Sequence, residues 1–268
     1  MAMDGMVAPS MKDKVSPEEW KARVDLAALY RLVALNGWDD LIYTHISARV
    51  PGPEHHFLIN PYGFLFEEMT ASMMVKVDLD GNLVDKSPYR INAAGFTIHS
   101  AIHNAREDAH FVMHLHTDQG VAVSAQPKGL QPLTQHASII LNDLAYHDYE
   151  GVALDLDERE RLVADLGKKN AMLLRNHGTL TAGPTAISCY TKMHYLERAC
   201  KMQVMAQSGG RVLEVGDNVL GKFRGGGMRP KDQPQATNRD RPMANIGVEF
   251  VWPSLLRKLD RENPGYDA

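Results

Sequence analysis

Cysteine is scarce in this sequence, since Cys189 and Cys200 are the only two cysteines among 268 residues. Two thiols are too few for a disulfide framework, so we expect a protein of a reducing compartment. Both cysteines lie in a stretch that is predicted to be one helix, where their separation corresponds to a rise of about 16 Å. Because that distance exceeds the reach of a disulfide, the sequence predicts two free thiols.

The sequence also lacks an excess of positive charge and any long apolar run. Its 29 lysines and arginines against 33 aspartates and glutamates give a formal net charge of -4. This balance predicts no binding surface for nucleic acid or for a membrane. No stretch approaches the roughly 18 to 20 apolar residues of a membrane-spanning helix, and residues 1–20 lack the apolar core of a secretory signal. We therefore expect a cytoplasmic protein.

With 44% hydrophobic and 23% charged residues, the composition is typical of a globular domain. We expect a disordered lead-in over residues 1–15, a folded domain over 16–208, and a polar arm with an apolar C-terminal segment over 209–268. The apolar residues after the arm include Phe250, Trp252 and Leu256. Leaving them in water would cost about 1.5 to 3 kcal/mol each. We therefore expect this segment to dock on a neighbouring subunit, with Trp252 as an anchor.

Local patterns predict both helices and hairpin-linked strands. Ser16 is a predicted N-cap, Pro17 occupies the first helical position, and Glu19 would complete a capping box. Further helices are predicted over 93–106 and 184–208. Strands are predicted over 42–50, 56–59, 74–79, 83–84, 110–116 and 171–175. Hairpin signals outnumber regular strand–helix–strand alternation, which favours an α+β fold, or an α/β fold with a largely antiparallel sheet.

Two histidines one residue apart, His114 and His116, end the apolar run that begins at Phe111. Successive strand side chains alternate between the two faces of a sheet, so both imidazoles point the same way and can share one metal ion. Hydrogen-bonded histidines without a metal would give the same pattern. A third candidate, His177, follows the apolar strand 171–175, and Gly178 would allow close approach of the backbone.

The remaining histidines support several interpretations. His99 and His103 are four residues apart on a predicted helix, a spacing that can bind metal. No acid lies between them, so we expect one of them to pack or to orient the site and the other to be exposed. Asp118 is either a second partner for a metal-bound imidazole or a helix N-cap.

An ordered set of motifs over about residues 20–208 resembles the class II aldolase/adducin family. The set comprises YTHISARV, LINPYGFLFEEMTASMMVKVDLDGN, HLHTDQGVAVSA and RNHG. The resemblance implies that His114, His116 and His177 bind a divalent metal. Zinc is the expected ion, with manganese or iron(II) as alternatives. It also implies a three-layer α/β/α fold around a mostly antiparallel sheet, and a homotetramer with active sites at subunit interfaces.

The sequence departs from the aldolases of that family at several site positions. The family's acid/base glutamate corresponds to Gly95, and its phosphate-binding Gly-Asn and Ser-Ser pairs correspond to Thr44-His45 and Ala93-Ala94. A tyrosine proton donor of the family falls near Gln135-His136. The resemblance thus assigns His136 as the candidate proton donor, and imidazole titrates near neutrality. The candidate substrate-binding residues are Thr44, His45, Tyr62, Gly63 and Gly95.

These observations leave three functional hypotheses. The first is a divalent-metal-dependent lyase, either a decarboxylase or an aldolase-type enzyme, acting on a small non-phosphorylated hydroxy-, keto- or aromatic acid. The second is a non-haem iron oxygenase, because three histidines with open positions also suit iron(II). The third is a non-catalytic binding module. The segments AGFTIHSAIHNAREDAHFVMHLHT and NDLAYHDYEGV resemble the adducin branch, whose cytoskeletal members keep the three histidines.

Overall fold

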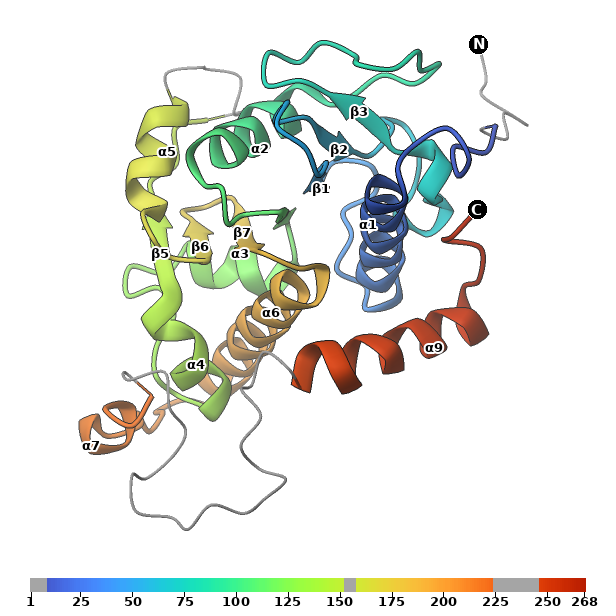
Figure 1. Cartoon of the computed structure of the whole chain (residues 1–268). Coiled ribbons are helices and arrows are strands. Elements are labelled where there is room, and N and C mark those ends of the chain that lie inside the picture. The colour runs from blue at the N-terminus through green and yellow to red at the C-terminus, as the bar shows by residue number, and fades with distance from the viewer. Residues whose placement is uncertain (1–8, 152–157, 224–245) are drawn as a thin grey trace.

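The computed structural model describes residues 9–151, 158–223 and 246–268 (Figure 1). Within these ranges a seven-stranded sheet has the order β3-β2-β1-β4-β7-β6-β5. Its strands are β1 (His45–Arg49), β2 (Phe57–Ile59), β3 (Val75–Val77), β4 (Phe111–Leu115), β5 (Leu144–His147), β6 (Ala171–Leu174) and β7 (Gly178–Gly183). All neighbouring strands pair antiparallel except β5 and β6, which run parallel. This confirms the prediction of a mostly antiparallel sheet.

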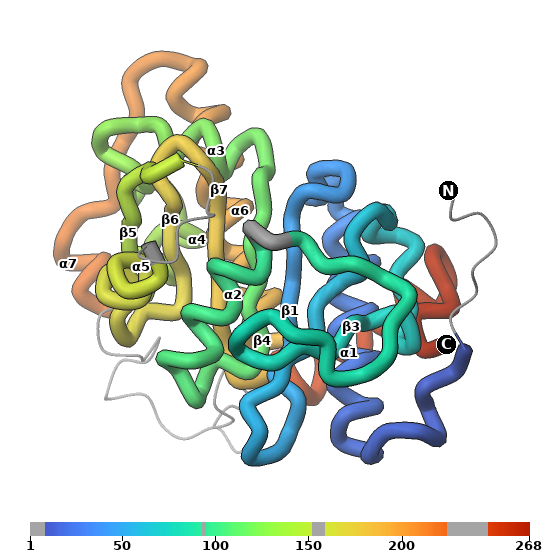
Figure 2. The backbone as a smooth tube through the Cα atoms, turned by 90° about the horizontal axis from the view of Figure 1, so that it is seen from above, coloured from blue at the N-terminus to red at the C-terminus, as the bar shows by residue number. Residues whose placement is uncertain are grey.

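Helices cover both faces of the sheet. On one face, α2 (Ala93–Ala105) and α5 (Glu158–Leu166) share a buried cluster with residues of β4 to β7. The opposite face carries α1 (Pro17–Leu35), α3 (Asp118–Ser124), α4 (Gln135–Ile140), α6 (Ala186–Ser208) and α9 (Trp252–Glu262). In both views α1 and α9 lie at one flank, and β5 and α5 lie at the other (Figures 1 and 2). The predicted three-layer α/β/α fold is therefore confirmed. None of the helices in the described ranges combines the length and the apolar character needed to cross a membrane.

The start of α1 confirms one half of the predicted capping motif and corrects the other. The Ser16 hydroxyl accepts a hydrogen bond from the Glu19 amide at 3.1 Å. The Glu19 side chain, however, accepts from Arg23 Nε at 2.9 Å and from Lys76 Nζ at 3.1 Å. Glu19 and Arg23 are both buried, and a buried cation needs a paired anion. Ion pairs with Arg23 on the same helix and with Lys76 on β3 therefore use the carboxylate that the sequence motif assigns to the helix end.

The predicted strands are shorter in the structure than in the sequence pattern. The strand predicted over 42–50 is β1, which begins at His45 and is buried at all five positions. Both of its faces are covered by helices, so its pattern is not the alternation of a half-exposed strand. The hairpin predicted around Asp80-Gly81 is reduced to β3 and a single bridge between Val77 and Leu83. β5 and β7 were not predicted.

The C-terminal segment packs on its own chain. A π-helical turn (Gly247–Val251) leads into α9, whose Leu259 is fully buried in the cluster around α1. Trp252, Leu255 and Leu256 pack against the same cluster. Of the polar arm, α7 (Asp217–Leu220) is described, whereas residues 224–245 lie outside the described residues, as do residues 1–8 of the predicted lead-in. Docking of this segment on a second subunit stays a prediction.

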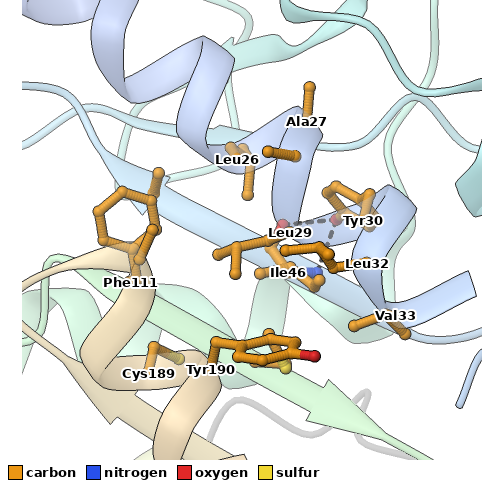
Figure 3. Packing of buried hydrophobic residues seen from close by; sticks show 14 of the residues in the cluster. Leu26, Ala27, Leu29, Tyr30, Leu32, Val33, Ile46, Phe111, Cys189 and Tyr190 are labelled. Carbon is orange, nitrogen blue, oxygen red and sulfur yellow. Dashed lines mark hydrogen bonds between the residues drawn. The ribbon is translucent and has the colours of Figure 1, made fainter. Parts of the chain in front are cut away.

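Tyr30 fixes the position of β1 against α1. Its hydroxyl accepts the Ile46 amide at 2.6 Å, and it lies 2.5 Å from the Ile46 carbonyl oxygen and 2.8 Å from Asn60 Oδ1. Figure 3 shows the two contacts with Ile46 among Leu26, Leu29 and the other apolar side chains of the core. Because Ile46 follows His45 directly, this contact sets the height of His45 in the sheet.

Replacing Tyr30 with Phe should therefore destabilise the fold. The variant keeps the ring but leaves the buried polar groups of Ile46 and Asn60 without their partner, at a cost of about 1 to 3 kcal/mol. Urea unfolding followed by circular dichroism measures this loss. Tyr43→Phe is the matched control, since Tyr43 is 51% exposed, and its effect should stay within about 0.5 kcal/mol. Equal stability of both variants would contradict this role of Tyr30.

Candidate metal site

Three imidazoles meet at one end of the central strands. His114 belongs to β4, His116 follows that strand, and His177 lies in the turn between β6 and β7. The ring centroids are 4.8 Å apart for His114 and His116, 4.7 Å for His114 and His177, and 4.9 Å for His116 and His177. One ring nitrogen from each of the three lies within 4.8 Å of the other two. The structure thus brings together the three residues predicted as metal ligands.

Hydrogen bonds to the outer nitrogens fix the tautomers of the two strand histidines. His114 Nδ1 lies 3.0 Å from the Thr179 carbonyl oxygen, and His116 Nδ1 lies 3.0 Å from Asp40 Oδ2. A carbonyl or a carboxylate oxygen can only accept, so both Nδ1 atoms carry the hydrogen, and in the neutral form of each ring Nε2 keeps the lone pair. Partners of this kind are typical of metal-binding histidines.

The two Nε2 atoms face each other at 3.0 Å. Two lone pairs at this separation repel each other unless a proton or a metal cation lies between them. Burial also lowers the pKa of His114 well below its usual value, and it lowers the pKa of His177 to about 4. Near neutral pH both rings are therefore uncharged, which is the form that binds metal. The residues present fit a divalent cation, and the nitrogen donors suit zinc.

Gly178 lets the backbone of β7 pass close to the triad. A Cβ atom at this position would lie 2.4 Å from the Leu115 carbonyl oxygen, 3.0 Å from His116 Cδ2 and 3.2 Å from His114 Cε1. The carbonyl belongs to the backbone of β4 and cannot move without breaking the ladder between β4 and β7. A glycine is therefore required here, in agreement with the close approach predicted from the sequence.

His45 lies beside the triad on the neighbouring strand. It pairs with His114 in the register of β1 and β4, and the two ring centroids are 5.1 Å apart. Its ring occupies the space beside Gly95, where a Cβ atom would lie 2.5 Å from His45 Cδ2. Two predicted substrate-binding positions, His45 and Gly95, thus meet next to the candidate metal ligands.

A chain of buried polar side chains continues from His45 away from the triad. His45 Nδ1 lies 2.8 Å from His99 Nε2, and Ser47 Oγ lies 2.5 Å from His99 Nδ1 and 2.7 Å from His103 Nε2. The chain ends where His103 Nδ1 meets the Ala109 carbonyl oxygen at 3.0 Å. His99 and His103 are both fully buried. The expectation that one of them is exposed was therefore wrong, because α2 turns both rings onto the sheet.

The other predicted site residues lie in different surroundings. Thr44 is buried, and its hydroxyl has no hydrogen-bond partner among the described residues. Tyr62 is half-buried and donates its amide to the Arg90 carbonyl, and Gly63 adopts a φ of 102° in an exposed turn. His136, on α4, contacts the ring of Tyr195 on α6 with a centroid distance of 5.7 Å. No contact between His136 and the triad is found within the described part of the chain, and its catalytic role stays a prediction.

Asp40 and Glu197 are site residues that the sequence did not reveal. Neither role predicted for Asp118 is found, because Asp40 is the partner of the His116 imidazole and Thr117 is the N-cap of α3, with Asp118 in the first turn of that helix. Glu197 is buried behind the triad, where the hydroxyls of Thr117 and Thr179 both donate to it. Burial raises the pKa of Glu197 to about 7. An acid on the apolar stripe of a helix, one turn after Met193, is the one signal that could have identified Glu197.

Gly178→Ala should weaken metal binding and the fold together. The added methyl group meets backbone and both strand imidazoles, and overpacking of this kind costs about 1 to 3 kcal/mol. Zinc per chain after dialysis, measured by elemental analysis, should fall relative to the wild type. Gly209→Ala serves as the control, since its Cβ would lie no closer than 3.4 Å to the nearest heavy atom. Full zinc occupancy in Gly178→Ala would show that the triad tolerates the displacement.

Comparison with known proteins extends the match beyond the triad. The chain is 62% identical over 270 residues to a class 2 aldolase-type protein of Caulobacter vibrioides, with 99% of each chain covered. Its fold is similar to the crystal structure of an aldolase II superfamily protein from Pseudomonas syringae, with a TM-score of 0.87, 50% identity, and coverage of 97% of this chain and 100% of the other.

An adducin is also among the relatives. Alpha-adducin of Mus musculus is 41% identical over 253 residues, which cover 91% of this chain but 33% of the adducin chain. Residues 24–204 match the family described as Class II Aldolase and Adducin N-terminal domain. This match, together with the fold and the histidine triad, shows that the chain belongs to the class II aldolase and adducin family.

Proposed function

We propose that this chain is a divalent-metal-dependent lyase that breaks a carbon–carbon bond, by aldol-type cleavage or decarboxylation, in a small non-phosphorylated acid. The observation that carries the proposal is the triad, in which His114 and His116 present bare Nε2 atoms 3.0 Å apart. A zinc ion bound there would act as a Lewis acid for the oxygens of the substrate. Manganese or iron(II) could bind the same nitrogen donors.

The side chains of the protein have separate roles in this proposal. His114, His116 and His177 would hold the metal, and Asp40 and the Thr179 carbonyl would keep the two strand histidines in the ligating tautomer. Glu197 and its two threonines support the strand ends behind the triad. His136 remains the candidate proton donor. Because it contacts Tyr195 rather than the triad within one chain, this role would need a neighbouring subunit.

The preference for a non-phosphorylated substrate is supported by the position that the family resemblance assigns to phosphate binding. There the side chain is His45, which burial keeps uncharged by lowering its pKa to about 3. Its Nδ1 hydrogen is used in the bond to His99, so the remaining nitrogen can only accept. An acceptor cannot hydrogen-bond to an unprotonated phosphate oxygen, which is itself an acceptor. The residue thus disfavours the ligand that a sugar-phosphate aldolase would bind.

The test compares His116→Ala with His110→Ala, because His110 is an exposed histidine outside the site. His116→Ala should lose bound metal and cleavage of hydroxy- or keto-acids, whereas His110→Ala should keep both. Metal is counted by elemental analysis, and products are identified by mass spectrometry. Full metal occupancy in His116→Ala would contradict the ligand assignment.

The same assay separates the alternative functions. Turnover of fuculose-, rhamnulose- or ribulose-type phosphates at about 1 per second or faster would contradict the proposed substrate class. Oxygen consumption that depends on iron(II) would indicate an oxygenase. A fully metal-loaded protein that turns over none of the acids would favour the non-catalytic binding module, for which the adducin relative is the precedent.

We further propose that the chain self-associates, as a homotetramer, through the apolar turn before α9. Val248 and Phe250 are 52% and 57% exposed, beside Ile246 and Val251 at 42% and 39%. An apolar group of this kind at the surface is typical of a contact with another protein. Truncation after Gly247 would uncover the core around α1, so a point variant is the sharper test.

Phe250→Asp should lower the molar mass measured by light scattering after gel filtration, because a charge would then be buried in the interface. Leu213→Asp is the control, since Leu213 is 86% exposed and lies on the arm after α6. The control should keep the mass of the wild type. An unchanged mass in Phe250→Asp would show that the turn is not part of the subunit contact.

A further inference from the structure

The chain of buried groups behind His45 has a defined direction. It ends at the Ala109 carbonyl oxygen, which can only accept, so the hydrogen of His103 lies on Nδ1. Burial lowers the pKa of His103 to about 3, and the ring is therefore uncharged, with a lone pair on Nε2. That lone pair accepts from the Ser47 hydroxyl, which lies 2.7 Å away.

The same reasoning passes along the chain to His45. Because the hydrogen of Ser47 points to His103, its oxygen accepts from His99 Nδ1 at 2.5 Å. His99, whose pKa burial also lowers, then has a bare Nε2 that accepts from His45 Nδ1 at 2.8 Å. One backbone carbonyl thus fixes the tautomer of three imidazoles, and His45 Nε2 is left with a lone pair.

This lone pair lies next to the candidate metal site. His45 and His114 are register partners on the same face of the sheet, with ring centroids 5.1 Å apart. Among the described residues no donor meets His45 Nε2, whereas its other nitrogen is bonded to His99. The absence of a side chain at Gly95 provides the space that the His45 ring occupies, because a Cβ at that position would lie 3.0 Å from His45 Nε2.

We propose that His45 Nε2 accepts a hydrogen bond from a substrate hydroxyl and thereby selects hydroxy acids over keto acids at the metal site. This inference rests on the proposed function and narrows its substrate class. An acceptor-only nitrogen forms a bond with a hydroxyl, but it faces a ketone oxygen with no hydrogen between them. His99, Ser47 and His103 are then positioning residues, since they act on the substrate through the tautomer of His45.

If these hydrogen-bonded residues served only to satisfy one another, the effect of breaking their bonds on acid binding would be different. Such a chain would contribute to stability, and breaking it would weaken the binding of hydroxy and keto acids equally. The selection proposed here requires that the two affinities change by different factors. The ratio of the affinities for two acids of matched shape is therefore the quantity to measure.

The probes are lactate and pyruvate, which differ at the second carbon by a hydroxyl against a ketone. Titration calorimetry with the zinc-loaded protein should show tighter binding of lactate by the wild type. In His45→Phe, which keeps an aromatic ring without the acceptor, the lactate-to-pyruvate affinity ratio should fall by about threefold to tenfold, the worth of one hydrogen bond. An unchanged ratio, or no lactate preference in the wild type, overturns the proposal.

Ser47→Ala tests the chain with a smaller change than a ring replacement. It removes the group between His99 and His103, so the tautomer of His45 is no longer fixed and the ratio should fall in the same direction. Ser100→Ala is the matched control, because Ser100 on α2 is also buried. Its hydroxyl donates to the Thr97 carbonyl and takes no part in the hydrogen-bonded chain behind His45. The control should keep the wild-type ratio and the same zinc content.

Nitrogen NMR of the zinc-loaded protein with labelled histidine reads the tautomers directly. His45, His99 and His103 should each carry the hydrogen on Nδ1, and Ser47→Ala should change the pattern of His45. A hydrogen on His45 Nε2 in the wild type would overturn the proposal even if the protein is a lyase. Conversely, a protein that cleaves no acid but shows this tautomer and this binding ratio would contradict the proposed function alone.

Discussion

The register between β1, β4 and β7 decides which side chains can meet at the candidate metal site. His45 lies opposite His114, and Leu115 lies opposite Thr179. A slip of one residue in either pairing would turn the imidazoles from the α2 face to the α6 face. It would also move the Thr179 carbonyl away from His114. Tyr30 holds the β1 side of this register, and Gly178 allows the close contact on the β7 side.

The two faces of the sheet bury different ionisable groups near the candidate metal site. On the α2 face His45 and His103 are uncharged, because burial lowers the pKa of each to about 3. On the α6 face Glu197 accepts from Thr117 and Thr179, and burial raises its pKa to about 7. Buried polar groups are tolerated when they are hydrogen-bonded. Each set of bonds therefore satisfies its own members and at the same time fixes the strand ends that carry the triad.

The sequence predicted the parts of this arrangement that are local. The spacing of His114 and His116 follows from the two-residue period of a strand, and the helices over 93–106 and 184–208 follow from helical patterns. Asp40 and Ser47 could not be identified in this way, because their partners His116 and His99 lie far along the chain. Glu19 shows the opposite case, in which a local motif was present but its carboxylate pairs with Arg23 one turn along the helix and with the distant Lys76 instead.

Membership of the family does not by itself define the reaction, because one fold carries many sites. The more specific constraint is the contact between His45 and Gly95. A Cβ atom at position 95 would lie 2.5 Å from the His45 ring, so a larger residue there and this position of His45 exclude each other. A carboxylate side chain at position 95 would therefore require residue 45 to move, which would break its hydrogen bond to His99. The two positions therefore change the chemistry of the site together, and the pair found here places an uncharged hydrogen-bond acceptor beside the candidate metal site.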